Sequence, residues 1–96
     1  MTRESGASLN ELAAELQELD QRLTAFKDRA KDAHPELKIG MQSQIYELDE
    51  KRMHAHEAIE KLSKAGTDEM PLADQTAEEA LTDLRTAIEV AETRFE

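Results

Sequence analysis

The chain has 96 residues and contains no cysteine and no tryptophan, with only three glycines, two prolines, two phenylalanines and one tyrosine. Without cysteine, disulfides, thiolate zinc sites and thiol catalysis are excluded. Scarce glycine and proline are typical of long helices and not of sheets and turns. No apolar run approaches the roughly 18 residues of a membrane span, and the N-terminus lacks the basic and apolar blocks of a secretion signal. We therefore expect an all-helical, soluble, cytoplasmic protein that has no membrane partner.

Charged residues, in contrast, make up 35% of the chain, and the formal net charge is −10. Because affinity for a phosphate backbone comes from lysine and arginine, we expect no nucleic-acid partner. Most of the excess lies in residues 66–96, which carry nine acidic and two basic residues. An acidic face there, including Glu78, Glu79 and Glu89, either serves solubility or binds a basic protein.

Apolar residues recur at alternating spacings of three and four in the first and last thirds of the chain. This heptad pattern describes a narrow apolar seam along a helix. It predicts helices over about residues 9–33 and 73–95. Ser8 and Glu11 have the spacing of a capping box, which predicts a helix start at Leu9 after a disordered segment 1–7. The seam residues are Leu9, Leu12, Leu16, Leu19, Leu23, Phe26, Ala30 and Ala33, and then Ala77, Leu81, Leu84, Ile88, Ala91 and Phe95.

The middle of the chain predicts a helix over about residues 36–65 with two apolar stripes. The second stripe, Ile39, Tyr46 and Met53, repeats every seven residues, about 140° around the helix from the first. We therefore expect this helix to be the central element and to touch two neighbours. The main stripe is Leu37, Met41, Ile45, Leu48, Ala55, Ile59 and Leu62.

Pro35 is predicted to start this helix, because an interior proline costs roughly 3 kcal/mol and a first-turn proline almost nothing. One long helix kinked at Pro35 is the alternative. Gly66 is expected to end the helix in the left-handed conformation.

The order of the charges predicts how the helices run. In the first two predicted helices acidic residues lie mostly early and basic residues mostly late. A parallel, in-register homodimer of the first helix would oppose like charges, whereas an antiparallel neighbour would not. We therefore predict one all-α domain over residues 8–96, an antiparallel three-helix bundle with heptad, coiled-coil-like packing.

His54 and His56 are the candidate metal ligands, and helix geometry argues against them. Residues two apart point about 200° apart, whereas zinc-binding pairs are spaced i and i+4. Glu60 follows His56 by four residues, which an ordinary surface ion pair explains. We predict no metal, no cofactor and, without a nucleophile motif or phosphate loop, no enzymatic activity. A metal site built across subunits from His54, His56 and His34 is an alternative.

Arg52 occupies a seam position between Leu48 and Ala55. A cation there costs stability unless it reaches solvent or an acid, and such residues are best known for setting register and choice of partner. Asp20 and Asp49 are the candidate internal acids; otherwise the stem packs and the charged head reaches solvent.

Burial of about twenty seam residues barely offsets the entropy of ordering the chain. This balance and the spare stripe of Ile39, Tyr46 and Met53 predict a homodimer, or completion by a partner protein. We therefore expect a non-enzymatic helical interaction or scaffolding module. The alternatives are a metal-binding bundle and an acidic regulator that occupies a basic protein surface.

Overall fold

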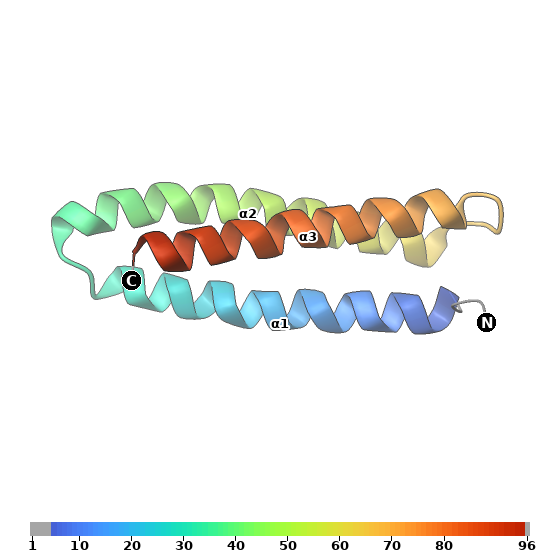
Figure 1. The fold of residues 1–96 in the computed structure, drawn as a ribbon, viewed down its shortest axis with the longest axis horizontal. Helices are drawn as coiled ribbons and strands as arrows, with labels where there is room; N and C mark the ends of the chain where they lie inside the picture. Colours follow the sequence, from blue (N-terminus) through green and yellow to red (C-terminus); the bar gives the residue numbers. More distant parts are fainter. Residues whose placement is uncertain (1–4, 96) are drawn as a thin grey trace.

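The protein folds into three helices, α1 (Ser5–Lys31), α2 (Pro35–Lys64) and α3 (Met70–Arg94). A computed structural model describes residues 5–95, and the side chains of residues 9–95. Each helix runs antiparallel to the one before it, so α1 and α3 point the same way (Figure 1). All three helix pairs are in contact, in a bundle of 50 × 20 × 16 Å. The predicted all-α three-helix bundle is confirmed.

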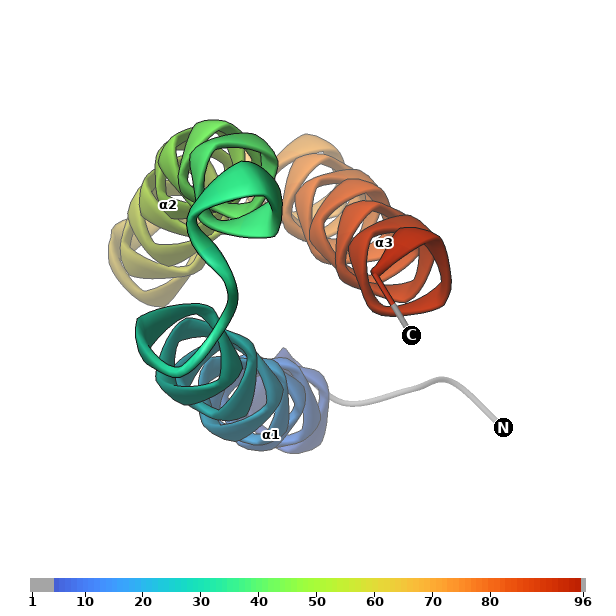
Figure 2. The same cartoon turned by 90° about the vertical axis from the view of Figure 1, so that its left-hand side faces the viewer.

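The heptad seams of the three helices form the core. Every buried side chain among residues 9–95 is apolar. Viewed along the bundle, the helices stand at the corners of a triangle (Figure 2), so each seam faces two neighbours at once. Within the described residues, no helix has the length and apolar composition needed to cross a membrane. The largest fully buried side chains are Phe26, Leu19, Leu48, Leu81, Leu84 and Ile88.

Pro35 begins α2, as predicted. The preceding residue, His34, is extended at φ −60° and ψ 150°, the conformation that a following proline favours. The last turn of α1 closes with two short-range bonds, in which the Asp32 and Ala33 amides donate to carbonyls three residues earlier, at 3.2 and 3.3 Å. The chain therefore reverses between Lys31 and Pro35, and the alternative of one long kinked helix is wrong.

The predicted helix ends differ from the structure by a few residues. Helix α1 is already formed at Ser5, so Ser8 lies within it and is no cap. The helix therefore starts four residues before the predicted start at Leu9, and residues 1–4 of the predicted disordered segment lie outside the described residues. Capping preferences are weak and several neighbouring residues can take the same role, so a sequence pattern places a helix end only to within a few residues.

The turn between α2 and α3 also differs from expectation. Ala65 is extended, at φ −71° and ψ 141°, and Gly66 does not have a positive φ, so the predicted left-handed cap is absent. Helix α3 begins at Met70, three residues before the predicted start, with a proline in its first turn. A proline suits that place because its fixed φ is helical and its missing N–H has no helix partner to lose.

The two stripes of α2 have different surroundings. Five residues of the main stripe and Ala58 are buried, but Leu37, near the start of the helix, is 51% exposed. The second stripe lies on the exposed side of α2: Ile39, Tyr46 and Met53 are 74%, 75% and 52% exposed. Helix α2 touches two neighbours, as expected, and so do α1 and α3, since all three helix pairs are in contact. In a triangle of helices, one broad face serves both contacts.

Gly40, in the first half of α2, is explained by the end of α3. A Cβ added there would lie 3.3 Å from the Phe95 ring. That ring also meets Phe26 edge to face, with centroids 6.0 Å apart. Arg29 lies over Phe26, and its guanidinium donates to the Phe95 carbonyl oxygen. A helical glycine costs about 1 kcal/mol against alanine, and here it admits an aromatic ring that ties all three helices together.

The core predicts a large effect of truncation at Leu84, which is 0% exposed. We expect Leu84→Ala to lower the free energy of unfolding by about 2–5 kcal/mol, from lost burial and the cavity left behind. Val90→Ala, on the same helix and 54% exposed, is the control and should change it by less than about 0.5 kcal/mol. Urea unfolding followed by circular dichroism measures both. Equal losses would mean that α3 does not pack as described.

Candidate interaction surface

Ion pairs join α1 to α2 along the edge of their seams. The Arg52 guanidinium donates twice to the Asp20 carboxylate, from Nε at 2.7 Å and from Nη2 at 3.1 Å. Lys27 and Asp49 form a second pair between the same helices, at 2.9 Å. These contacts cross-link α1 and α2 at two points and restrain their register.

The other two helix pairs are joined in the same way. Arg22 of α1 binds Glu92 of α3 at 2.7 Å, and Arg85 of α3 lies 3.4 Å from Glu15 of α1. Lys51 of α2 donates to Asp83 of α3 at 2.9 Å. Every helix interface therefore carries opposite charges at its rim, where partly exposed pairs choose the arrangement without supplying much stability.

Arg52 combines the two interpretations drawn from the sequence. Its internal partner is Asp20 and not Asp49, while its side chain remains 41% exposed. The hydrogen bond to Asp20 raises the pKa of Arg52; desolvation acts in the opposite direction, and the charges of Asp20 and Asp49 add to the rise. The guanidinium thus leaves the core between Leu48 and Ala55 and is neutralised at its edge. Its predicted role in choosing a partner stays a prediction.

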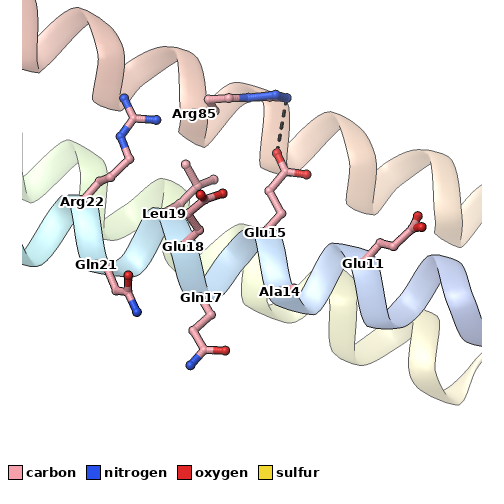
Figure 3. Close-up of a pocket in the computed structure, with 9 residues that line it drawn as sticks. All are labelled: Glu11, Ala14, Glu15, Gln17, Glu18, Leu19, Gln21, Arg22 and Arg85. Carbon is pink, nitrogen blue, oxygen red and sulfur yellow. Dashed lines mark ion pairs between the residues drawn. The ribbon is translucent and has the colours of Figure 1, made fainter.

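A surface hollow of about 740 Å³ lies along the α1–α3 edge. Its walls include Glu11, Glu15, Glu18 and Arg22 from α1, with Arg85 reaching over from α3 (Figure 3). The hydrogen bond that Arg22 donates to Glu92 raises the pKa of Arg22; desolvation lowers it, and the charges of Glu92, Glu89 and Glu18 raise it further. Both arginines of the hollow are ion-paired, so its free charge is negative.

Sequence analysis missed this hollow. The glutamates recur at four- and three-residue spacings on one flank of α1, which is the signal that could have found it. That signal needs a second fact, namely that α3 brings Arg85 to the same side.

His54 and His56 do not come together. Both are exposed, and His56 Nε2 lies 3.5 Å from Glu60 Oε2, in the predicted i, i+4 pair. His34 stands at the other end of α2, about 30 Å from His54 at 1.5 Å per residue. In the described part of the chain, no group of three or more Asp, Glu or His side chains is placed to hold a metal ion.

The acidic residues predicted on α3 do not form one face. Glu79 is exposed and accepts a hydrogen bond from Gln75 at 3.2 Å. Glu89 acts on Arg22 across the α1–α3 edge, while Glu78 is half-buried. The negative charge of α3 is therefore divided between its outer side and its edge.

The outer stripe of α2, defined as Ile39, Tyr46 and Met53, is the most regularly spaced apolar feature of the described surface. Its residues are seven apart, about 10.5 Å along one side of the helix, and lie away from the core. Between the first two lie the neutral residues Gln42 and Ser43. The other large apolar side chains exposed in residues 9–95, Leu37, Leu72 and Val90, do not continue this row.

Comparisons of the chain with protein-family models, with curated proteins and with solved structures find no match. The functional inference therefore depends on the geometry of these surfaces.

The two-point pair of Arg52 and Asp20 predicts coupled effects of mutation. Arg52→Leu or Asp20→Leu leaves one partly buried charge without its partner, whereas the double variant leaves none. After solvent screening, we expect each single change to cost about 0.5–1 kcal/mol, and the double variant to be at least as stable as either single. Urea unfolding of the four proteins measures the coupling, which should shrink in about 1 M NaCl. Additive losses would contradict the pairing.

Lys51 predicts a pH dependence at the α2–α3 edge. Its hydrogen bond to Asp83 raises the pKa of Lys51 above the ordinary value of 10.5, against desolvation. A raised folded-state pKa stabilises fully below the ordinary value, and this contribution is lost as pH rises through the raised one.

We therefore expect the difference in melting temperature between the wild type and Lys51→Gln to be constant from about pH 7 to 9 and to close above about pH 10.5. Lys51→Arg is the control, because arginine stays charged in this range. If the melting temperatures of the wild type and Lys51→Gln still differ at the highest pH, the pair contributes nothing through its charge.

Proposed function

We propose that this protein is a non-enzymatic helical interaction module that self-associates into a homodimer through the outer stripe of α2. The observation that carries the proposal is the exposure of Ile39, Tyr46 and Met53, at 74%, 75% and 52%. A seam between two helices has apolar residues at two positions in every seven, and the outer stripe supplies one of these positions over three successive heptads. The natural partner of this face is therefore another helix, and the copy of α2 in a second chain is one that already has the repeat.

The rest of the fold supports such a role by holding α2 rigid. Helices α1 and α3 bind its inner face through the core, and three ion pairs fix its edges. A face held in its binding shape loses little conformational freedom when a partner arrives, which favours association.

The size of the stripe sets the strength of the dimer. Burial of an exposed large apolar side chain contributes up to roughly 1.5–3 kcal/mol, whereas association costs at least about 4 kcal/mol in lost freedom. With three such side chains on each chain, we expect a transient interface with a dissociation constant in the micromolar range or weaker.

A non-enzymatic role agrees with the apolar interior of the bundle. General acids and bases are tuned by burial, and the buried side chains of residues 9–95 are all apolar. The proposal keeps the cytoplasmic location and the absence of a nucleic-acid partner that the sequence predicts, the latter from the net charge of −10.

Sedimentation equilibrium tests the dimer. We expect the mass of the wild type to rise from one chain to two between about 1 µM and about 1 mM. The double variant Ile39→Ser, Tyr46→Ser should remain monomeric over this range, because it removes two of the three apolar side chains of the outer stripe.

The matched control is Leu72→Ser, Val90→Ser, which removes two exposed apolar side chains from α3 and should associate like the wild type. A wild type that is monomeric throughout, or a control that also loses the dimer, would refute the proposal. A basic protein that binds the monomer would instead favour the acidic regulator.

A further inference from the structure

We infer that in this dimer the two α2 helices pack antiparallel, with both Tyr46 side chains at the two-fold axis and Ile39 against the partner's Met53. The inference deepens the proposed function, on which it rests, by naming the orientation and register of the second copy. It follows from the symmetry of the outer stripe and from the charges between its residues.

The outer stripe is symmetric about Tyr46. Ile39 comes seven residues before it and Met53 seven residues after it. A two-fold interface joins the same surface of both subunits, so each contact occurs twice. Antiparallel packing gives three apolar layers, Ile39 with the partner's Met53, Tyr46 with the partner's Tyr46, and the first contact again. Parallel packing also gives three layers, so apolar burial does not choose between the two orientations.

The side chains between the layers favour the antiparallel orientation over the parallel one. Gln42 and Ser43 separate Ile39 from Tyr46, whereas Asp49 and Glu50 separate Tyr46 from Met53. In a parallel dimer the two carboxylates would face their own copies beside an apolar seam, which is destabilising. In the antiparallel dimer they face the partner's Gln42 and the partner's Ser43, whose amide and hydroxyl groups donate hydrogen bonds.

Glu50 carries most of this difference. Asp49 is already neutralised by Lys27 of its own chain, at 2.9 Å. Glu50 is exposed on the outer side of α2 and would keep its full charge at a parallel interface. The antiparallel register removes this repulsion and replaces it with contacts to neutral donors.

The charge near the far end of the seam gives the same answer. Glu57 follows Tyr46 by eleven residues, and Pro35, in the first turn of α2, precedes it by eleven. Antiparallel packing therefore places Glu57 beside the start of the partner's α2, where the helix dipole favours a carboxylate, although Glu36 also lies in that first turn. Parallel packing would place it beside the partner's Glu57.

The bundle leaves room for this contact. Both α1 and α3 lie on one side of α2 (Figure 2), whereas the outer stripe is on the exposed side. A second α2 can therefore approach along its whole length of about 45 Å without meeting the other two helices.

The absence of cysteine allows a direct test with three single-cysteine variants, Ile39→Cys, Tyr46→Cys and Met53→Cys. Each is first shown to associate by sedimentation, then oxidised with diamide and separated without reductant. A disulfide requires Cα atoms about 4.4–6.8 Å apart, so cross-linking reports which positions face each other.

We expect Tyr46→Cys to cross-link with itself, at least about tenfold above the exposed control Leu72→Cys, because association concentrates the two thiols. Ile39→Cys and Met53→Cys should each cross-link poorly alone and efficiently when mixed.

Three results would overturn the inference. Efficient self-cross-linking of all three variants means a parallel dimer, which removes the orientation and keeps the proposed function. A dimer in sedimentation that yields no stripe cross-link uses another surface. Monomeric protein without cross-links removes the proposed dimer as well.

Discussion

The three apolar seams meet along one axis, and the placement of the charged side chains follows from that meeting. Because the seams pack against one another, the residues at the edges of each seam come within reach of the next helix. Asp20, Arg22 and Lys51 all stand at such edges, and each meets an opposite charge. Burial thus supplies the stability, while the edge pairs select one register and one orientation among those that burial alone would allow.

The features found from the sequence are those that depend on short-range periodicity. Helix geometry and charge order were enough to predict three of these features: the seams of α1 and α3, the start of α2 at Pro35, and Asp20 or Asp49 as the partner of Arg52. The predicted helix boundaries at Ser8 and Gly66 differ from the structure, because capping depends on small, competing local preferences. The α1–α3 hollow was missed because Glu15 and Arg85 are 70 residues apart in sequence, and their meeting depends on the packing of the whole bundle.

The outer stripe shows a different limit. Periodicity identifies an apolar row but does not say whether a row faces a helix of its own chain. In a three-helix bundle the main stripe of α2 packs against both neighbours, so Ile39, Tyr46 and Met53 are not needed for packing within the chain. Scattered apolar side chains are ordinary on a protein surface, whereas a row at seven-residue spacing lies along one side of a helix, as part of a helix seam does.

The proposed dimer face on α2 has a consequence for the surfaces that such a dimer would leave open. The exposed side of α1 carries Ala14, Gln17 and Gln21, small or neutral residues with little apolar surface to bury. On α3, Leu72 and Val90 are 18 residues apart, about 27 Å along the helix, too far to form one seam. In the proposed dimer, pairing through α2 would turn α1 and α3 of both subunits outward, so both α1–α3 hollows would remain accessible. Such a dimer would carry two identical hollows with free negative charge on its outer sides.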